Sequence, residues 1–543
     1  MPEKPVDVIA YDALHQPLSP LFLDYLAGHE RVRPFLGPGG FDLAAVAGAA
    51  EGTLSVERPL AAVAEALARQ QEGRGAARAA GRARKLRERG ATAIVTGQQA
   101  GLFGGPLFVL WKALATVRVA ALLENARGRP VVPVFWVASD DHDFAEIRST
   151  SVIDAAGSIR TLRYAPRQEP VGRPAWAIAL DDTIGSVLEE LGQAVPPGLG
   201  RDETLALAAE CYRPDATLSE AFAAFVSRLL PELVVLDPAD ATLKRLMGPV
   251  LARELREGSP TSRLALDAGR DLLAAGYHQQ VPVRPGFLNL FAVVEGERHA
   301  LALSNGVVEV RGTRERWPIE EALRRLESEP ASWSPAALLR PLAQDALLPT
   351  AAYVGGPAEI AYHAQIGPSY EHFGIPRPAL LPRPSLTLVE PAQARALEAE
   401  RLTLGDLVQD PEALVSRWAR EDYPDVETAF TRAREAIERE MRGVEEALGE
   451  HDPTLRAAAA TARGRAVFPL EGLHEKALRA LKKRDQGRAD RLRRTRDALL
   501  PGGSLQERGL GLVGALSRHG LALVSEIAEV LDPFARGHQV VRR

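Results

Sequence analysis

Four carboxylates and one imidazole fall within seven residues, in Asp140-Asp141-His142-Asp143 and Glu146. Like charges this close repel one another unless solvent, a cation or a proton separates them. If the segment is helical, His142 and Glu146 share one face. The cluster therefore indicates general-base chemistry, or Mg²⁺ held through nucleotide phosphates. A solvated acidic helix start is the alternative interpretation.

A glycine-rich turn precedes this cluster and reads TGQQAGLFGGP from Thr96 to Pro106. Glycine lets the backbone approach a ligand closely, and free N–H groups at the next helix start can face an anion. The turn has neither the Gly-Lys-Ser/Thr of a P-loop nor the GxGxxG spacing of a dinucleotide-binding turn. A tight strand-to-helix turn without a ligand is the alternative. Lys112, on the following helix, is a candidate phosphate contact or a surface charge.

A second turn of similar design, Gly355-Gly356-Pro357, opens another predicted helix. Glu359 and His363 stand one helical turn apart there, and Tyr362 and Gln365 also project polar groups. Glu359 suits an amine or a ribose hydroxyl, or it satisfies the helix N-terminus. We expect His363 to be structural.

The elements around the first turn have the pattern of a βαβ unit. Ala93–Thr96 is a short strand, and apolar residues then recur at helical spacing from Leu107 to Leu123. Val131–Val137 is a continuous apolar run, as expected of a strand buried on both faces. Open α/β sheets bind ligands in loops beyond the carboxyl ends of parallel strands. The unit therefore predicts a small-molecule site between two such loops.

The whole chain is predicted to be an α/β protein with a helical arm. The α/β core is expected to carry inserted subdomains at about 148–280 and in the 285–345 region. The four predicted segments are an N-terminal helical segment that packs on the core, the core itself, a helical coiled coil, and a C-terminal helical segment that returns to the core, at residues 1–90, 91–390, 391–503 and 504–543.

The arm has the pattern of a helical hairpin. Apolar residues from Val426 to Leu448 recur close to the α-helical period. A second helical stretch, from about Leu470 to Leu500, is expected to pair back along it. Such an arm exposes an apolar seam, which predicts a homodimer.

Bulk composition excludes several classes of protein. The 543 residues are 46% hydrophobic and 25% charged, as in soluble globular proteins of two or three domains. The net charge of −5 argues against a general polyanion binder. Lys476 to Arg496 is strongly basic but has no interleaved aromatic residue, which favours a solvated arm over a nucleic-acid groove.

The same composition bears on compartment and metal content. Cys211 is the only cysteine, which excludes an intrachain disulfide and a multi-cysteine zinc site. The N-terminal stretch MPEKPVDVIAYDALHQ has no apolar core of signal-peptide length, and the chain has no run of 18 apolar residues. We therefore expect a cytoplasmic protein with neither nucleic acid nor membrane as a partner.

Several long strings of this chain resemble the bacillithiol biosynthesis cysteine-adding enzymes, the BshC family. They extend from about Val95 to Arg508 and occur in the order of that family. The resemblance implies a Rossmann-like core of the nucleotidyl-transferase and class I synthetase type with connective insertions, and a coiled-coil dimerisation arm. The strings are TGQQAGLFGGPL, PVVPVFWVASDDHDFAEI, LRPLAQDALLPTAAYVGGPAEIAYHAQ, LLPRPSLTLVE and PGGSLQERGL.

The activity that the resemblance implies is that of a ligase forming a carbon–nitrogen bond. Such an enzyme adds cysteine to the amine of glucosaminyl-malate and gives the thiol bacillithiol. By analogy with synthetases, ATP would activate the cysteine carboxylate as an adenylate. A nucleotide-binding coiled-coil dimer that acts as a scaffold or regulator without catalysis is the alternative.

The resemblance also implies roles for individual residues. Asp141, His142 and Asp143 would form the catalytic group that orients substrate, Mg²⁺ or the attacking amine. The glycine-rich turn stands in place of an HxGH-type turn, although it has no histidine, and Arg383 replaces the lysine of a mobile loop. No metal ligand is assigned. The nucleotide- and substrate-binding set is Gly97, Gln98, Gln99, Gly101, Gly104, Lys112, Trp136, Gly355, Gly356, Glu359, Tyr362, Gln365, Arg383, Ser385 and Thr387.

Overall fold

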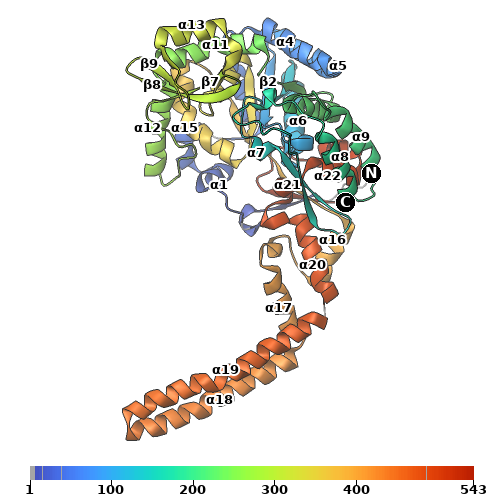
Figure 1. Ribbon diagram of the computed structural model, residues 1–543, viewed down its shortest axis with the longest axis vertical. Coiled ribbons are helices and arrows are strands. Elements are labelled where there is room, and N and C mark those ends of the chain that lie inside the picture. Colours follow the sequence, from blue (N-terminus) through green and yellow to red (C-terminus); the bar gives the residue numbers. More distant parts are fainter. Residues whose placement is uncertain (1–5, 15, 38–39, 485) are drawn as a thin grey trace. The chain divides into compact units, whose positions relative to one another are not determined.

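A computed structural model describes residues 6–14, 16–37, 40–484 and 486–543. It separates into two compact units (Figure 1). The first, here called the core, comprises Met1–Val389 with Ser504–Arg543, and the second, here called the arm, is Glu390–Gly503. The chain leaves the core once and returns once, so the arm is a single insertion.

The core is built on a five-stranded sheet in which all strands are parallel. The strands lie in the order β13-β12-β2-β3-β6. Along the chain this is the 3-2-1-4-5 order of Rossmann folds, in which the strand order reverses between the first strand, β2, and the fourth, β12. The predicted Rossmann-like core is therefore confirmed. The strands are β2 (Thr92–Gln98), β3 (Val131–Val137), β6 (Val234–Leu236), β12 (Thr350–Gly355) and β13 (Ala379–Pro382).

Helices cover this sheet, which is why its strands read as continuous apolar runs. The helix that follows β2 is buried around most of its circumference and ends at Gly128, which caps it in the left-handed conformation. Another helix joins β12 to β13, and shorter N-terminal helices pack against β6 and β12. These helices are α6 (Phe108–Arg127), α15 (Pro357–Phe373), α3 (Leu43–Thr53), α4 (Leu60–Gly73) and α5 (Ala77–Arg84).

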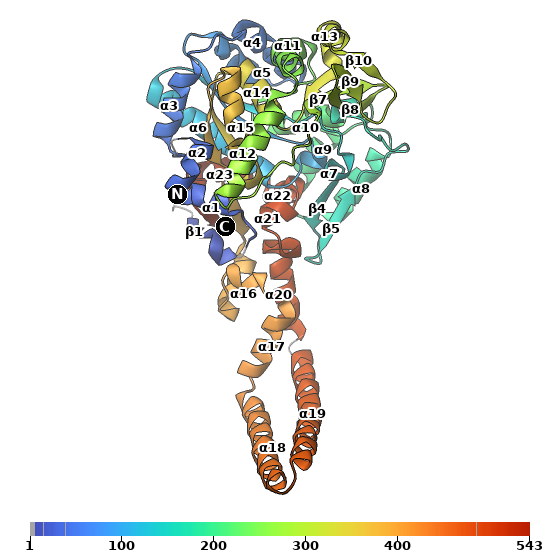
Figure 2. The same ribbon diagram turned by 90° about the vertical axis from the view of Figure 1, so that its left-hand side faces the viewer.

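A small sheet joins the two ends of the described core (Figure 2). Its central strand, β15 (His538–Arg542), runs antiparallel to β1 (Val6–Ile9) and parallel to β14 (Ser385–Val389). The segments 1–90 and 504–543 were predicted to be helical, and their strands β1 and β15 are the correction. Their pairing partners lie hundreds of residues away, so no local periodicity reveals them. The helices of the C-terminal segment are α21 (Gln506–Gly509), α22 (Leu512–His519) and α23 (Ala522–Val530).

The predicted insertion at 148–280 is divided by β6, a strand of the central sheet. Before β6 the chain forms a β-hairpin and a group of helices, and after β6 it forms two further helices. The interval therefore holds two excursions rather than one subdomain. The elements before β6 are α7 (Phe144–Ile147), β4 (Ser149–Ile153), β5 (Ile159–Arg163), α8 (Ile184–Ala194), α9 (Arg201–Cys211) and α10 (Leu218–Leu229), and those after it are α11 (Ala241–Arg256) and α12 (Pro260–Ala274).

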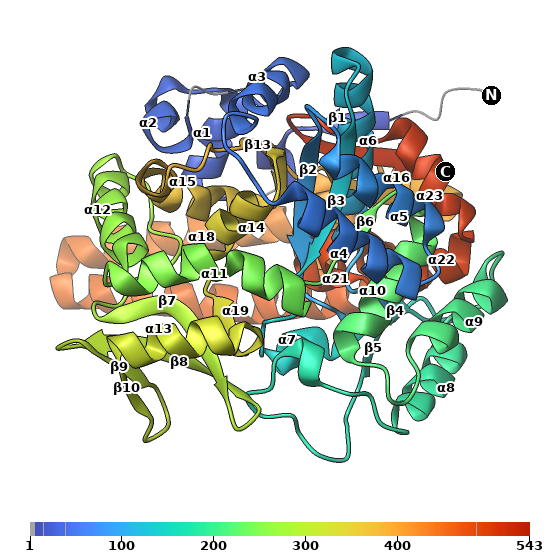
Figure 3. The same cartoon turned by 90° about the horizontal axis from the view of Figure 1, so that it is seen from above.

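The 285–345 region forms a second, antiparallel sheet with α13 (Ile319–Ser328) beside it (Figure 3). Its β7–β8 pair is a β-hairpin that turns at Glu295 and Gly296. This sheet lies at one side of the core, and α14 (Arg340–Leu347) follows its last strand along the chain. Its strands are β7 (Phe287–Val294), β8 (Glu297–Ser304), β9 (Val307–Val310), β10 (Arg316–Pro318) and β11 (Trp333–Pro335).

The arm is helical throughout its described elements, and α18 (Pro424–His451) lies antiparallel to α19 (Pro453–Arg484) (Figure 1). The second helix begins at Pro453 rather than near Leu470, because its first half is rich in alanine and shows no clear apolar period. Within the basic stretch, Arg488 pairs with Glu400 and Asp422 of the arm. Asp485 lies outside the described residues. The other helices are α16 (Pro391–Glu400), α17 (Pro411–Glu421) and α20 (Gln486–Leu499).

Candidate functional site

A cleft of about 530 Å³ opens in the core at the carboxyl ends of β2 and β12. This is the point where the strand order of the sheet reverses, and such points leave a crevice between the diverging loops. Gly97 and Gln98 line it from β2, and Tyr353 and Gly356 line it from β12 and the turn that follows. The position of the cleft therefore follows from the topology alone.

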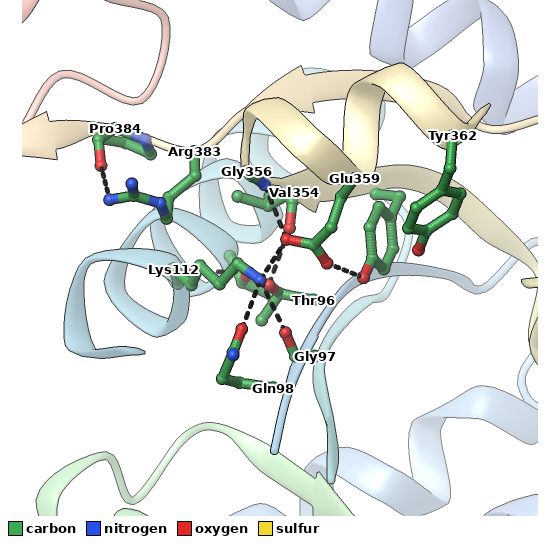
Figure 4. Close-up of polar contacts among 12 residues, drawn as sticks. Thr96, Gly97, Gln98, Lys112, Val354, Gly356, Glu359, Tyr362, Arg383 and Pro384 are labelled. Carbon is green, nitrogen blue, oxygen red and sulfur yellow. Dashed lines mark hydrogen bonds and ion pairs between the residues drawn. The ribbon is translucent and has the colours of Figure 1, made fainter. Parts of the chain in front are cut away.

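A buried ion pair closes the base of the cleft (Figure 4). The Lys112 side chain is 1% exposed, and its Nζ donates to Gly97 O at 2.8 Å, Gln98 Oε1 at 3.0 Å and Glu359 Oε2 at 2.5 Å. All three ammonium protons are thus used inside the protein. Lys112 is neither a surface charge nor a free phosphate contact; it ties α6 to β2 and α15.

Glu359 is held from three sides. Besides Lys112, it accepts hydrogen bonds from Tyr353 Oη at 2.5 Å and from Gly356 N at 2.7 Å. Burial raises the pKa of Glu359, but the Lys112 ammonium and the hydrogen bonds from Lys112, Tyr353 and Gly356 together lower it by more, so the carboxylate stays ionised. Of the two roles considered from sequence, the structure shows Glu359 satisfying the start of α15.

Arg383 is also buried and ion-paired, unlike the residue of a mobile loop that the resemblance implied. Its guanidinium lies 2.7 Å from Glu507 Oε1 and stacks over the Phe108 ring at 5.0 Å. Glu507 is 0% exposed and accepts a further hydrogen bond from Leu386 N at 2.7 Å. Arg383 therefore lines the cleft as a fixed side chain anchored from α21.

Ser385 and Thr387 lie behind Arg383 on β14, away from the cleft. Ser385 Oγ donates its proton to Glu507 Oε1 and therefore accepts a hydrogen bond from His538 Nδ1. The other ring nitrogen, His538 Nε2, accepts from Thr387 Oγ1. Burial lowers the pKa of His538 to about 4, so this imidazole is neutral. The predicted binding roles of Ser385 and Thr387 are thus replaced by a buried network that supports the wall.

The acidic side of the cleft is organised by Gln99. Its Nε2 donates to Asp141 Oδ2 at 2.7 Å and to Glu146 Oε2 at 2.8 Å. One neutral amide thus holds two carboxylates together without neutralising either of them. Their remaining lone pairs are available to a cation or to an amine.

His142 and Asp143 are the correction to the predicted catalytic group, because neither lines the cleft. His142 Nδ1 lies 3.2 Å from Arg298 Nη1, and a guanidinium only donates, so the proton of the neutral ring is on Nε2. Burial, and next the Arg298 charge, lower the pKa of His142. Asp143 caps α7 by accepting from Glu146 N. Only Asp141 of the three faces the cleft.

The glycine-rich turn is pinned from behind by a buried tyrosine. Tyr212 Oη accepts from Gly104 N at 3.0 Å and donates to Gly101 O at 3.1 Å. A Cβ at Gly104, where φ is +86°, would lie 2.9 Å from the Phe225 ring. Leu107 N, at the start of α6, donates to Leu510 O. These N–H groups are engaged internally and do not face an anion, contrary to the expectation from sequence.

The structure brings most of the predicted binding residues together. Four of them lie outside the cleft: Gly104, Ser385 and Thr387, as described, and Gln365, which instead bonds the backbone of Val281. Gly355 adjoins the cleft without lining it. Those that line the cleft are Gly97, Gln98, Gln99, Gly101, Lys112, Trp136, Gly356, Glu359, Tyr362 and Arg383.

Two arginines of the cleft were missed, although both stand in strings that carried the family resemblance. Arg340 donates to Tyr362 Oη and Gln344 Oε1, each at 2.9 Å. Arg508, in α21, is exposed at the cleft, and within the described residues its guanidinium has no hydrogen-bond or ion-pair partner. In the sequence, each arginine could be noticed only as a charged residue within a distinctive string. The fold was needed to bring the two together.

Comparison with known proteins now identifies the family. The model of the bacillithiol biosynthesis BshC N-terminal Rossmann-like domain matches residues 6–384, and that of the BshC C-terminal coiled-coil domain matches residues 386–543. The chain belongs to the BshC family. Both predicted features, the Rossmann-like core and the coiled coil, are thereby confirmed.

Three BshC relatives of this chain carry the same name. The protein from Salinibacter ruber is 33% identical over 96% of each chain, and that from Koribacter versatilis is 35% identical over 84% of each chain. The protein from Chlorobaculum tepidum is 33% identical over 84% of each chain. Each bears the name "Putative cysteine ligase BshC".

Two further observations concern metals and membranes. The described residues contain no group of three or more His, Cys, Asp or Glu side chains placed to hold a metal ion. Within the same part of the chain, no helix combines the length and the apolar content that a membrane crossing requires.

Proposed function

We propose that this protein catalyses the ATP-dependent addition of cysteine to the amine of glucosaminyl-malate, the ligation that yields bacillithiol. The names of the relatives support cysteine ligation. The observation that carries the proposal is the cleft itself. Its Asp141–Gln99–Glu146 cluster lies at the same switch point of the sheet as several Lys and Arg side chains, some of them ion-paired and some not.

The proposed reaction has two balanced steps. The cysteine carboxylate attacks the α-phosphorus of ATP, which forms cysteinyl-adenylate and releases pyrophosphate. The sugar amine then attacks the acyl carbon, and AMP and one proton leave as the amide forms. Mg²⁺ would enter with the nucleotide phosphates.

The acidic cluster is suited to the second step. An amine attacks only as the free base, so the bound ammonium must lose a proton before or during attack. Asp141 and Glu146 offer carboxylate oxygens to that ammonium, while Gln99 fixes the spacing between them. His142 takes no part as a base, because its Nδ1 is occupied by Arg298 and its Nε2 carries the proton.

We also propose that the arm pairs with a second copy of the chain. No described residue of α18 is buried, and Phe468 and Leu473 of α19 are 74% and 56% exposed. An apolar seam left open by an intrachain hairpin is stabilised when another coiled coil covers it. Light scattering is expected to report a dimer that Phe468→Glu weakens; a wild-type monomer at micromolar concentration would remove this part of the proposal.

The test of function is incubation with glucosaminyl-malate, cysteine and ATP, followed by mass spectrometry of thiol and nucleotide products. We expect bacillithiol together with AMP. ADP in place of AMP would point to an acyl phosphate instead of an adenylate. Substrates that bind without turnover would favour the scaffold alternative.

A matched pair of variants locates the chemistry. Asp141→Asn keeps the shape of the side chain but removes its charge, and we expect it to lower kcat/KM for amide formation by about 100-fold. Asp143→Asn makes the same change two residues further along the chain, outside the cleft, and is expected to retain activity within about threefold because it perturbs only a helix cap. Equal losses in the two variants would contradict the assignment.

A further inference from the structure

Charged side chains meet this cleft in two different states. Lys112 is matched by Glu359 at 2.5 Å, and Arg383 is matched by Glu507 at 2.7 Å. These four groups cancel in pairs and are largely buried. They shape the cleft without leaving a net charge for a ligand.

None of the other charged side chains lining the cleft forms a Lys or Arg to Asp or Glu ion pair among the described residues. Arg340 bonds only neutral acceptors, Tyr362 and Gln344, and the Arg508 side chain has no protein partner. On the acidic side, Asp141 and Glu146 share the neutral Gln99 amide. The cleft therefore offers two guanidiniums and two carboxylates that have no ion-pair partner of their own to whatever binds there.

We propose that Arg508 and Arg340 form a dicarboxylate subsite that selects the malyl part of the acceptor substrate. This inference rests on the proposed function. Glucosaminyl-malate carries two carboxylates and one amine, so its charges complement two guanidiniums without a paired carboxylate and an acidic cluster. Arginine suits the task because its planar fork binds a carboxylate through two parallel hydrogen bonds.

The glycine-rich turn argues against a polyphosphate as the ligand of these arginines. Phosphates are commonly cradled by successive free backbone N–H groups. Here Gly104 N is bonded to Tyr212, Gly105 N to Leu102 O and Leu107 N to Leu510 O. The arginine side of the cleft thus relies on side-chain cations, which match a pair of carboxylates.

The position of Arg508 is fixed by its neighbour in the chain. Glu507 is fully buried and bonds Arg383, Ser385 and the backbone of Leu386. This anchors α21 against β14, so that the next residue projects its side chain at the cleft. Arg508 is accordingly a specificity-determining residue delivered by the segment that follows the arm.

The experiment compares Arg508→Ala and Arg508→Lys with Arg263→Ala, a matched control at an exposed arginine of α12 outside the cleft. Steady-state KM is measured for glucosaminyl-malate, cysteine and ATP in turn. The acceptor is then replaced by methyl glucosaminide, which has the amine but no carboxylate. Isothermal calorimetry gives the Kd of glucosaminyl-malate and of L-malate for each variant.

We expect Arg508→Ala to raise KM for glucosaminyl-malate by about tenfold or more, the loss of a charge-assisted bond. KM for cysteine and ATP should stay within about twofold of wild type, as should kcat/KM for methyl glucosaminide. Arg508→Lys should fall between the two, since it keeps the charge but loses the fork. Arg263→Ala should behave as wild type.

Other results would overturn the subsite. A rise in KM for ATP alone would assign Arg508 to phosphate, and equal losses with both acceptors would make its role structural. If wild type forms no product, the proposed function fails, and the calorimetric Kd values still decide this inference. Selective loss of glucosaminyl-malate binding in Arg508→Ala would support it; equal or absent binding in all proteins would end it.

Discussion

The core and the arm use the same basic side chains in opposite settings. In the core, the Lys112 and Arg383 side chains are 1% and 5% exposed, and each has a carboxylate within 2.7 Å. In the arm, Arg479 and Arg442 pair with glutamates one turn away while remaining more than half exposed. A buried charge depends on its partner because water no longer solvates it, whereas a surface pair exchanges with water at little loss. Charged side chains therefore determine the structure of the cleft, whereas in the arm they mainly keep the helices solvated.

The largest expected effect is that of breaking the buried pair. Lys112→Met leaves Glu359 without its counter-ion, and we expect the free energy of unfolding of the core to fall by about 3–5 kcal/mol. Urea unfolding followed by near-UV circular dichroism measures it. Lys476→Met, at an exposed position of α19, is the control and should change stability by less than about 0.5 kcal/mol. Similar effects at the two sites would erase the contrast between the regions.

The next effect is a pH dependence that arises from a buried imidazole of the core. The pKa of His538 is about 4 in the folded protein, below the value of about 6.5 for an unfolded chain. The unfolded state then takes up the proton first, so this contribution is intact above about pH 6.5 and is lost as the pH falls to 4, by about 3 kcal/mol. His538→Gln lacks this loss, and the stability difference between wild type and variant should shrink by that amount. Parallel stability curves for the two proteins would refute the assignment.

A smaller effect should appear in activity rather than stability. Gln99→Leu removes the amide that separates Asp141 from Glu146, and their repulsion should spread the cluster. We expect kcat/KM for cysteine addition to fall by about 10- to 100-fold with little change in the melting temperature of the core. Gln486→Leu, which removes an exposed amide of the arm, should leave activity unchanged. Full activity of Gln99→Leu would show that the cluster needs no spacer.

The smallest effect belongs to a surface pair of the arm. Arg479→Ala removes the contact with Glu475, and the expected loss of helix stability is below about 0.5 kcal/mol. Thermal melting at 222 nm measures it. A loss as large as that of Lys112→Met would mean that the arm, too, depends on individual ion pairs.

Local pattern was sufficient for the elements that carry the cleft. The short run Ala93–Thr96 and the apolar run Val131–Val137 predicted the adjacent strands β2 and β3, because strands buried on both faces show as apolar runs. Glycine-rich turns after β2 and β12 marked the loops at the switch point. The Asp141 cluster was found because its composition is unusual for a stretch of seven residues.

What the sequence patterns missed were individual side-chain contacts between residues far apart in the chain. Lys112 was read as a possible surface charge, yet its partner Glu359 lies 247 positions further along. Arg508 joins the cleft only because β14 and α21 meet after the whole arm has intervened. The tautomer of His142 is set by Arg298, which comes from a different sheet. Helical and strand periods carry no information about such encounters.

The two points where the chain leaves and rejoins the core are hydrogen-bonded neighbours. Gln506 bonds both the N–H and the carbonyl of Leu388, while β14 is held in parallel by β15. The core is thus already closed at the base of the arm, and loop-closure entropy changes only slowly with the length of what is looped out. The arm is therefore an insertion that can vary independently of the core. Its length and surface can change during evolution while the wall of the cleft that carries Arg383 and Arg508 keeps its structure.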